Sequence, residues 1–143
     1  MIINEYTNLK LHGLHAHIGS QIFETSIYAD EIDILCREIS RLDEKYAVKL
    51  DEINIGGGLG VKYTKEDNPP SIEEFADAIT SALDKFSKKP TIYIEPGRSI
   101  ISPSTVTLYT IGSSKQVPEG RKYTAIDGGM ADNLRPSLLI VRG

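Results

Sequence analysis

Four short glycine-containing motifs, each preceded by an apolar run, constrain the fold of this chain more than any other feature. They are His-Ile-Gly-Ser-Gln at residues 17–21, Gly-Gly-Gly-Leu-Gly at 56–60, Glu-Pro-Gly-Arg at 95–98 and Asp-Gly-Gly-Met at 127–130. Parallel strands gather such turns at their carboxyl ends, where glycines admit a ligand and polar residues contact it. The motifs therefore predict an α/β protein with a ligand site at one edge of its sheet.

The segments between the first three motifs alternate between strand and helix patterns. They are predicted strands at 11–18, 50–55 and 91–94, and predicted helices at 27–46 and 72–86. Ser71 and Glu74 form a capping box at the start of the second helix. Strand, helix, strand, helix, strand makes two βαβ units, which require a parallel sheet.

The helical rhythm stops after residue 98. Residues 104–111 are rich in β-branched side chains and residues 123–126 form another strand-like run, with turn residues at 118–120 between them. These patterns predict that the chain leaves the parallel sheet for an antiparallel β region.

Length bounds the architecture. A complete eight-stranded barrel needs roughly 250 residues, whereas this chain has 143. We therefore predict part of a TIM (β/α)8 barrel, about its second half, over residues 1–101. Residues 102–143 would begin a C-terminal β domain and include a segment that returns to the barrel site.

Composition excludes several classes of partner. The formal net charge of -4 and the scattered lysines leave no basic face for a nucleic acid. No apolar run reaches the roughly 18 residues of a membrane span, so we expect no membrane partner. The single cysteine, Cys36, falls at a core-facing helical position and cannot form an internal disulfide. We expect a cytoplasmic protein.

Two histidines are candidate ligand contacts. His15 and His17 alternate with apolar residues in the first strand and therefore point to one face, which in a barrel is the interior. Such histidines are often satisfied structurally by their neighbours. For His17, the nearby Gly19 and Ser20 favour a ligand, because they offer close backbone approach, a hydroxyl and amide donors to a phosphate or a flat ring.

A glycine run and three charged residues complete the candidates. The glycines at 56–58 could turn several N–H groups toward one anion, or form only a tight structural turn. Glu95 and Arg98 flank a rigid Pro-Gly turn; they could form a salt bridge, or bind a cationic ring nitrogen and an anion respectively. Arg135 is a second candidate anion ligand. The Asp-Gly-Gly before it could equally mark a hairpin.

Taken together, the ordered motifs resemble those of the diaminopimelate decarboxylases. The matching segments are Gly-Leu-His-Ala-His-Ile-Gly-Ser-Gln at 13–21, Ile-Gly-Gly-Gly-Leu-Gly at 55–60, Glu-Pro-Gly-Arg at 95–98 and Asp-Gly-Gly-Met-Ala-Asp-Asn-Leu-Arg-Pro at 127–136. That family consists of fold-type III enzymes of the ornithine and arginine decarboxylase superfamily, which use pyridoxal 5'-phosphate. The resemblance extends from about residue 11 to residue 138.

The resemblance implies a cofactor-binding role for the first three motifs. His17 would stack on the cofactor ring, and Ser20 with the amides of Gly56, Gly57 and Gly58 would hold its phosphate. Glu95 would hydrogen-bond the pyridine nitrogen and keep it protonated, so that the cofactor can accept the electrons released when carbon dioxide departs. His17 and Glu95 would therefore be the catalytic residues.

The resemblance also implies substrate contacts. Pro96 and Gly97 would lie against the cofactor, Arg98 between the cofactor phosphate and the substrate, and Arg135 on a substrate carboxylate. The implied lyase reaction is decarboxylation of meso-2,6-diaminopimelate to L-lysine, in lysine biosynthesis, by a homodimer that takes a small amino-acid substrate.

Two parts of the family's site have no counterpart in the sequence. Family members carry a Schiff-base lysine on an early barrel strand and a Cys-Glu-Ser motif with a tyrosine further on. These 143 residues contain neither, and Lys62 and Lys65 lie in a predicted loop. We expect the chain to be a fragment that is catalytically inactive in isolation.

Two alternatives stay open. One is a related decarboxylase acting on ornithine, arginine or carboxynorspermidine, although Met130 and Arg135 suit a substrate with a distal carboxylate better. The other is a non-catalytic half barrel that binds phosphate compounds or regulates a decarboxylase subunit.

Overall fold

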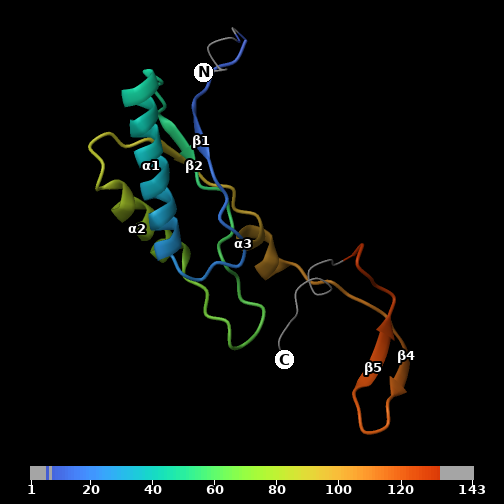
Figure 1. Cartoon of the computed structure of the whole chain (residues 1–143). Coiled ribbons are helices and arrows are strands. Elements are labelled where there is room, and N and C mark those ends of the chain that lie inside the picture. Colours follow the sequence, from blue (N-terminus) through green and yellow to red (C-terminus); the bar gives the residue numbers. More distant parts are fainter. Residues whose placement is uncertain (1–5, 7, 133–143) are drawn as a thin grey trace. The chain divides into compact units, whose positions relative to one another are not determined.

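The computed structural model describes residue 6 and residues 8–132 of the chain. The chain divides into two compact units, Met1–Ser104 and Thr105–Gly143 (Figure 1). Arg135 lies outside the described residues.

The first unit is built on a three-stranded parallel sheet. Strands β1 (Gly13–His15), β2 (Glu52–Asn54) and β3 (Thr91–Tyr93) lie in the order β1-β2-β3, and His15, Asn54 and Tyr93 occupy one register position across them. The helices connect the strands as two βαβ units, so the predicted α/β class and parallel sheet are confirmed. Each strand is shorter than its sequence pattern predicted.

Two helices cover one face of this sheet (Figure 1). Helix α1 (Ser26–Tyr46) ends at Ala47, which adopts a left-handed conformation with φ of 54°. Helix α2 (Ile72–Leu83) begins with the predicted capping box, because the Ser71 hydroxyl accepts from the Glu74 N–H and the Glu74 carboxylate accepts from the Ser71 N–H. Both helices lie within about three residues of their predicted bounds.

The hydrophobic core lies between these helices and the sheet. Ile53 and Ile55 of the β2 segment are fully buried, and the rings of Tyr28 and Phe75 meet edge to face with centroids 4.8 Å apart. Cys36 is buried here as predicted. The core also includes Glu31, which is only 4% exposed; no sequence pattern predicts that this helix residue is buried.

The segment that follows β3 differs from the sequence-based prediction. A short helix, α3 (Arg98–Ile101), and a 3-10 turn, η2 (Ser102–Ser104), come directly after the Glu-Pro-Gly-Arg motif. The predicted strand at 104–111 is wrong, since residues 105–110 form no regular element and a strand begins only at Ile111. β-branched residues fit a strand, but only pairing with another strand creates one.

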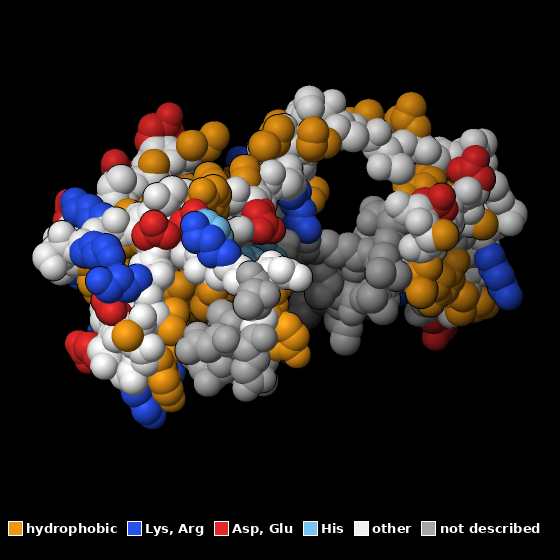
Figure 2. All heavy atoms as spheres, turned by 90° about the horizontal axis from the view of Figure 1, so that it is seen from above, with side chains coloured by type: hydrophobic (Ala, Val, Ile, Leu, Met, Phe, Trp, Pro, Cys, Tyr) orange, Lys and Arg blue, Asp and Glu red, His pale blue; other side chains and the backbone are white. Residues whose placement is uncertain are grey.

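The second unit contains an antiparallel hairpin, as predicted for this part of the chain. Strands β4 (Ile111–Gln116) and β5 (Lys122–Ile126) pair around a turn in which Glu119 has φ of 55°. Every residue of both strands is exposed. Hydrophobic side chains are visible on the surface of this hairpin at the right of Figure 2.

Within the described residues, the helices are too short or too polar to cross a membrane.

Candidate functional site

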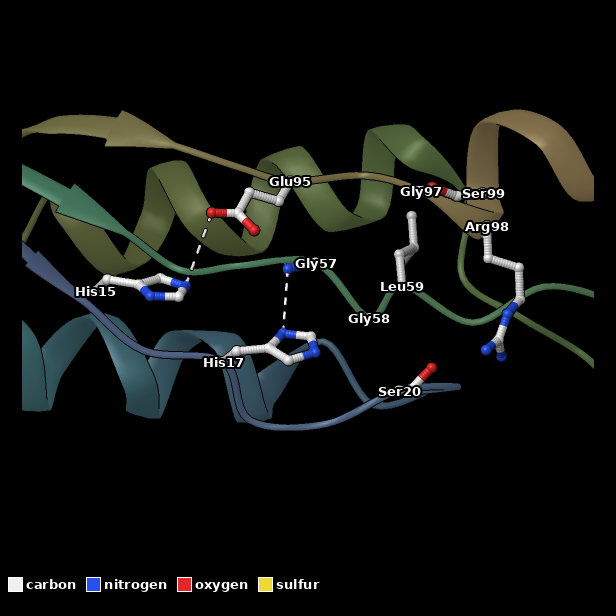
Figure 3. Close-up of a pocket in the computed structure, with 10 residues that line it drawn as sticks. All are labelled: His15, His17, Ser20, Gly57, Gly58, Leu59, Glu95, Gly97, Arg98 and Ser99. Carbon is white, nitrogen blue, oxygen red and sulfur yellow. Dashed lines mark hydrogen bonds and ion pairs between the residues drawn. The ribbon is translucent and has the colours of Figure 1, made fainter. Parts of the chain in front are cut away.

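The first three glycine motifs meet at the carboxyl ends of β1, β2 and β3. They enclose a pocket of about 290 Å³ (Figure 3). Its lining residues are His15, His17, Ser20, Gly57, Gly58, Leu59, Glu95, Gly97, Arg98 and Ser99. The strands are parallel and in register, and so their ends deliver these residues to the same edge of the sheet.

His17 is fixed by the glycine turn beside it. Its Nδ1 accepts a hydrogen bond of 3.3 Å from the Gly57 N–H (Figure 3). An imidazole that accepts at Nδ1 carries its proton on Nε2 when neutral. A Cβ at Gly56 would lie 2.6 Å from the same Nδ1, so a glycine there permits the ring to pack against the turn. The imidazole is therefore held in one orientation at the pocket wall.

The glycine turn is closely packed between the other two motifs. Gly56 and Gly58 have φ of 66° and 99°, which favour glycine. A Cβ at Gly57 would overlap the Glu95 carbonyl oxygen, and one at Gly58 would overlap the Gly19 carbonyl oxygen. These positions require glycine because the three loops touch backbone to backbone.

The amides of this turn are not equivalent. The Gly56 N–H donates to Asn54 Oδ1 at 2.8 Å, and the Gly57 N–H donates to His17. The Gly58 N–H takes part in neither of these bonds, nor in any other hydrogen bond found within the described part of the chain. Three backbone amides are predicted to contact a phosphate. Of these, the Gly58 N–H is the one that can donate to a ligand without giving up a described hydrogen bond.

Glu95 is held by two side chains from the neighbouring strands. Asn54 Nδ2 donates to Glu95 Oε1 at 2.7 Å. His15 Nε2 lies 3.8 Å from the same oxygen (Figure 3). The Glu95 side chain remains 59% exposed. The sequence analysis did not identify Asn54 as a site residue. Its position at the end of the second predicted strand, directly before the glycine run, could have indicated it.

Arg98 reaches the pocket from the first turn of α3. Its Nη1 donates to Gln21 Oε1 at 3.2 Å, and its guanidinium lies 5.9 Å from the centre of the Tyr63 ring. Gln21 is itself anchored to the backbone of Val61, donating 2.6 Å to the carbonyl and accepting 3.2 Å from the N–H. Gln21 thus links the first motif to the third, a role that the sequence did not reveal.

A buried phenol supports the glycine turn from the core. The Tyr28 hydroxyl donates to the Gly57 carbonyl oxygen at 3.2 Å. Burial, with a smaller contribution from the nearby Glu31 carboxyl, raises the pKa of Tyr28 to about 12. The hydroxyl therefore keeps its proton and remains a donor across the physiological range.

The described residues of the predicted site line one pocket or adjoin it. Residues that line the pocket are His17, Ser20, Gly57, Gly58, Glu95, Gly97 and Arg98; Gly56 and Pro96 adjoin it without lining it. The Asp-Gly-Gly-Met motif at 127–130 belongs to the second unit. There the Thr110 N–H donates to the Asp127 carboxylate at 2.8 Å.

The pocket carries groups of both charge signs. It presents one carboxylate from Glu95, one guanidinium from Arg98, two imidazoles and two serine hydroxyls. A carboxylate suits a protonated ring nitrogen, whereas a guanidinium and backbone N–H groups suit a phosphate or carboxylate. Both kinds of group lie in one pocket.

Sequence comparison identifies relatives of the chain. It is 39% identical over 136 residues to a diaminopimelate decarboxylase of Bacillus subtilis and 43% identical over 139 residues to one of Synechocystis. These alignments include 92% and 94% of the chain but 31% and 29% of the relatives. The chain thus spans about a third of the length of the curated relatives it matches.

Solved structures and a family model agree with these relatives. The fold is similar to diaminopimelate decarboxylase from M. jannaschii, with a TM-score of 0.75 at 32% identity, covering 89% of this chain and 30% of that one. It is also similar to the Helicobacter pylori enzyme complexed with L-lysine, with a TM-score of 0.76 at 28% identity, covering 96% and 33%. The family model described as pyridoxal-dependent decarboxylase, pyridoxal binding domain, matches residues 1–102. The chain therefore belongs to the pyridoxal-dependent decarboxylases.

Proposed function

We propose that this chain is the pyridoxal-binding part of a diaminopimelate decarboxylase, which converts meso-2,6-diaminopimelate to L-lysine. The observation that carries this proposal is the pocket at the ends of β1, β2 and β3, where Glu95, His17 and Arg98 meet. Relatives of that name at 39–43% identity favour this substrate over others in the family. The chain spans about a third of those relatives, so the reaction is assigned to the whole protein that contains it.

The pocket fits pyridoxal 5'-phosphate by the chemistry of its donors. The Gly58 N–H, Arg98 and the hydroxyls of Ser20 and Ser99 supply donors and positive charge for a phosphate. The flat imidazole of His17, held by Gly57, offers a face for an aromatic ring. Glu95 supplies an acceptor for a protonated ring nitrogen. Glycines at 56–58 let the three loops pack closely together beside this pocket.

Each residue then has a distinct task. Glu95 keeps a proton on the ring nitrogen, which lets the cofactor act as an electron sink. His17 holds the ring in one plane, and the amide of Gly57 keeps its imidazole in that orientation. Arg98, braced by Gln21, places positive charge where a phosphate or a substrate carboxylate would lie. Binding and orientation are therefore the contributions of this part of the chain.

Several finer features extend the proposal to the whole protein. We infer that β1, β2 and β3 are consecutive strands of a (β/α)8 barrel, since they are parallel, in register and joined by covering helices. Arg135 is proposed to bind a substrate carboxylate, and a homodimer is proposed as the active assembly. The exposed apolar side chains of the hairpin support burial against further protein.

A related decarboxylase is the second candidate. A lysine/ornithine decarboxylase from Vibrio vulnificus complexed with putrescine has a TM-score of 0.71 to this chain at 27% identity, covering 90% of it and 35% of that chain. The same pocket could therefore serve a substrate without a distal carboxylate. Substrate competition distinguishes the two candidates.

The test is a decarboxylation assay on the protein expressed from its complete gene with pyridoxal 5'-phosphate. We expect lysine to form from meso-diaminopimelate, with little amine from lysine, ornithine or arginine, and Glu95→Gln to lower kcat by about 100-fold or more. Putrescine from ornithine as the main product would support the second candidate. Phosphate-compound binding without any decarboxylation would instead favour a non-catalytic module.

A further inference from the structure

We propose that Asn54 is a positioning residue that sets the orientation of the Glu95 carboxylate, and that it acts through Glu95 on the ring nitrogen of the cofactor. The inference rests on the proposed function, because it assigns Glu95 to that nitrogen. It assigns a role to a side chain outside the four glycine motifs.

The geometry places Asn54 between two functional loops. Its Nδ2 donates to Glu95 Oε1 at 2.7 Å, while its Oδ1 accepts from the Gly56 N–H at 2.8 Å. One amide thus ties the carboxylate that follows β3 to the glycine turn that follows β2. Both hydrogen bonds are short, and the Gly56 bond fixes which way the amide faces, since only its oxygen can accept.

The hydrogen bond occupies one oxygen of Glu95 and leaves the other to a ligand. Asn54 and His15 both approach Oε1, at 2.7 Å and 3.8 Å. The described residues give Oε2 no hydrogen-bond partner. A carboxylate at the end of a flexible side chain that is 59% exposed samples several rotamers unless something restrains it. Asn54 supplies that restraint, so that Oε2 is presented in one direction.

The strand register explains why Asn54 can do this. His15, Asn54 and Tyr93 share one register position, and Glu95 follows Tyr93 by two residues, which returns its side chain to the same face. Asn54 lies on β2, between the strand that carries His15 and the strand that leads to Glu95. The central strand of the three is therefore the one that can bridge its neighbours.

Asn54→Asp separates the two contacts of this residue. The aspartate retains an oxygen for the Gly56 N–H but loses the N–H₂ group that donates to Glu95. Asn54→Ala removes both contacts and serves as the matched comparison. Both variants are made in the protein expressed from its complete gene, alone and combined with Glu95→Gln.

The readout is equilibrium binding of two probes. One is pyridoxal 5'-phosphate, and the other is its deaza analogue, in which a carbon replaces the ring nitrogen. We expect Asn54→Asp to weaken binding of pyridoxal 5'-phosphate by about 10-fold and of the analogue by less than about 2-fold, because a charge-assisted hydrogen bond is lost only with the former. In the Glu95→Gln background, the additional effect of Asn54→Asp should fall below about 2-fold.

Four results would overturn the inference. An equal loss for both probes would mean that Asn54 only supports the fold, and a loss in Asn54→Ala but not in Asn54→Asp would mean that it serves the glycine turn alone. If Glu95→Gln lowers the preference for pyridoxal 5'-phosphate over the analogue while Asn54→Asp does not, the proposed function stands and only the role of Asn54 fails. If Glu95→Gln leaves that preference unchanged, the assigned role of Glu95 fails as well.

Discussion

The two units of the chain differ in where their apolar side chains lie. In the first unit, Ile32, Ile53 and Ile55 are fully buried between the helices and the sheet. In the second unit, Val106 is 83% exposed, Leu108 87% and Ile111 72%. Strands β4 and β5 are longer than β1, β2 and β3, yet all of their residues are exposed to solvent.

A region can therefore have regular secondary structure without a stabilising core. A lone two-stranded hairpin is marginally stable in water because one ladder of hydrogen bonds barely offsets the cost of ordering the chain. The short strands of the first unit are stabilised by the helices packed over them. The candidate pocket lies on this unit, where a rigid core can position side chains.

The largest effect is expected from truncating a central core residue. Ile53→Ala should lower the free energy of unfolding of the first unit by about 2–5 kcal/mol, because it opens a cavity in a fully buried site. The matched change in the hairpin, Ile111→Ala, should cost less than about 0.5 kcal/mol. Hydrogen exchange of the α1 amides under native conditions measures the first, and exchange of the β4 amides the second. Equal losses would remove the distinction between the units.

The next effect concerns the pH dependence of the two units. Glu31 is buried with neither carboxylate oxygen hydrogen-bonded to any described residue, and burial raises its pKa from 4.5 to about 7. The folded state therefore binds more protons than the unfolded state between these values, so stability falls as the pH rises from 4.5 to 7. The shift corresponds to a loss of about 3 kcal/mol in the free energy of unfolding, and this loss is complete above pH 7. Glu31→Gln should flatten this dependence and raise stability at pH 8.

The hairpin should show the opposite sign. Hydrogen bonds from the Thr110 hydroxyl and N–H lower the pKa of the exposed Asp127 below its ordinary 3.8. Its contribution is present above pH 3.8 and is lost as the pH falls through the lowered pKa. Stability curves of wild type, Glu31→Gln and Asp127→Asn between pH 3 and 9 separate the two groups. A first unit that gains stability on passing from pH 4.5 to 7 would contradict the assignment to Glu31.

A third prediction contrasts two glycines. Gly57→Ala should destabilise the first unit by roughly 1–3 kcal/mol and disturb the pocket, because the new Cβ overlaps the Glu95 carbonyl oxygen. Gly112→Ala in β4 should be neutral or slightly stabilising, since a Cβ there lies 3.6 Å from the nearest atom. Thermal unfolding measures both, with pyridoxal 5'-phosphate binding as a second readout for Gly57→Ala. A tolerated Gly57→Ala would argue against the close packing of the three loops.

The sequence predicted the parts of this molecule that local patterns determine. Helical periodicity and the capping box at Ser71 located both long helices, and the glycine motifs located most of the pocket lining. Contacts between distant residues escaped prediction, because no periodicity encodes them. Asn54 bridging to Glu95 and Gln21 bridging to Arg98 depend on the strand register and on the path of the loops.

The errors have similar causes. The predicted strand at 104–111 failed because β propensity does not identify a pairing partner, and the partner of β5 begins at Ile111. Glu31 lies in the second turn of α1, where a charged side chain normally faces water, whereas packing buries it. In each case tertiary structure overrode a correct local tendency.

The smallest expected difference between the two units concerns one serine hydroxyl in each. In the first unit, the Ser71 hydroxyl caps α2 by accepting from the Glu74 N–H at 3.1 Å. In the second, the Ser114 hydroxyl lies 2.9 Å from the Thr124 hydroxyl across the exposed hairpin. Ser71→Ala should cost about 1 kcal/mol, because helix amides lose their acceptor and the helix anchors the core.

Ser114→Ala should cost no more than about 0.5 kcal/mol, because water replaces the lost partner at an exposed site. Denaturant unfolding followed by far-UV circular dichroism measures both variants, and Ser71→Asp, which restores a cap, serves as the rescue. Equal costs for the two alanines, or no rescue by aspartate, would mean that the capping box adds nothing beyond an ordinary surface hydrogen bond. The stability of the first unit would then come from its core alone.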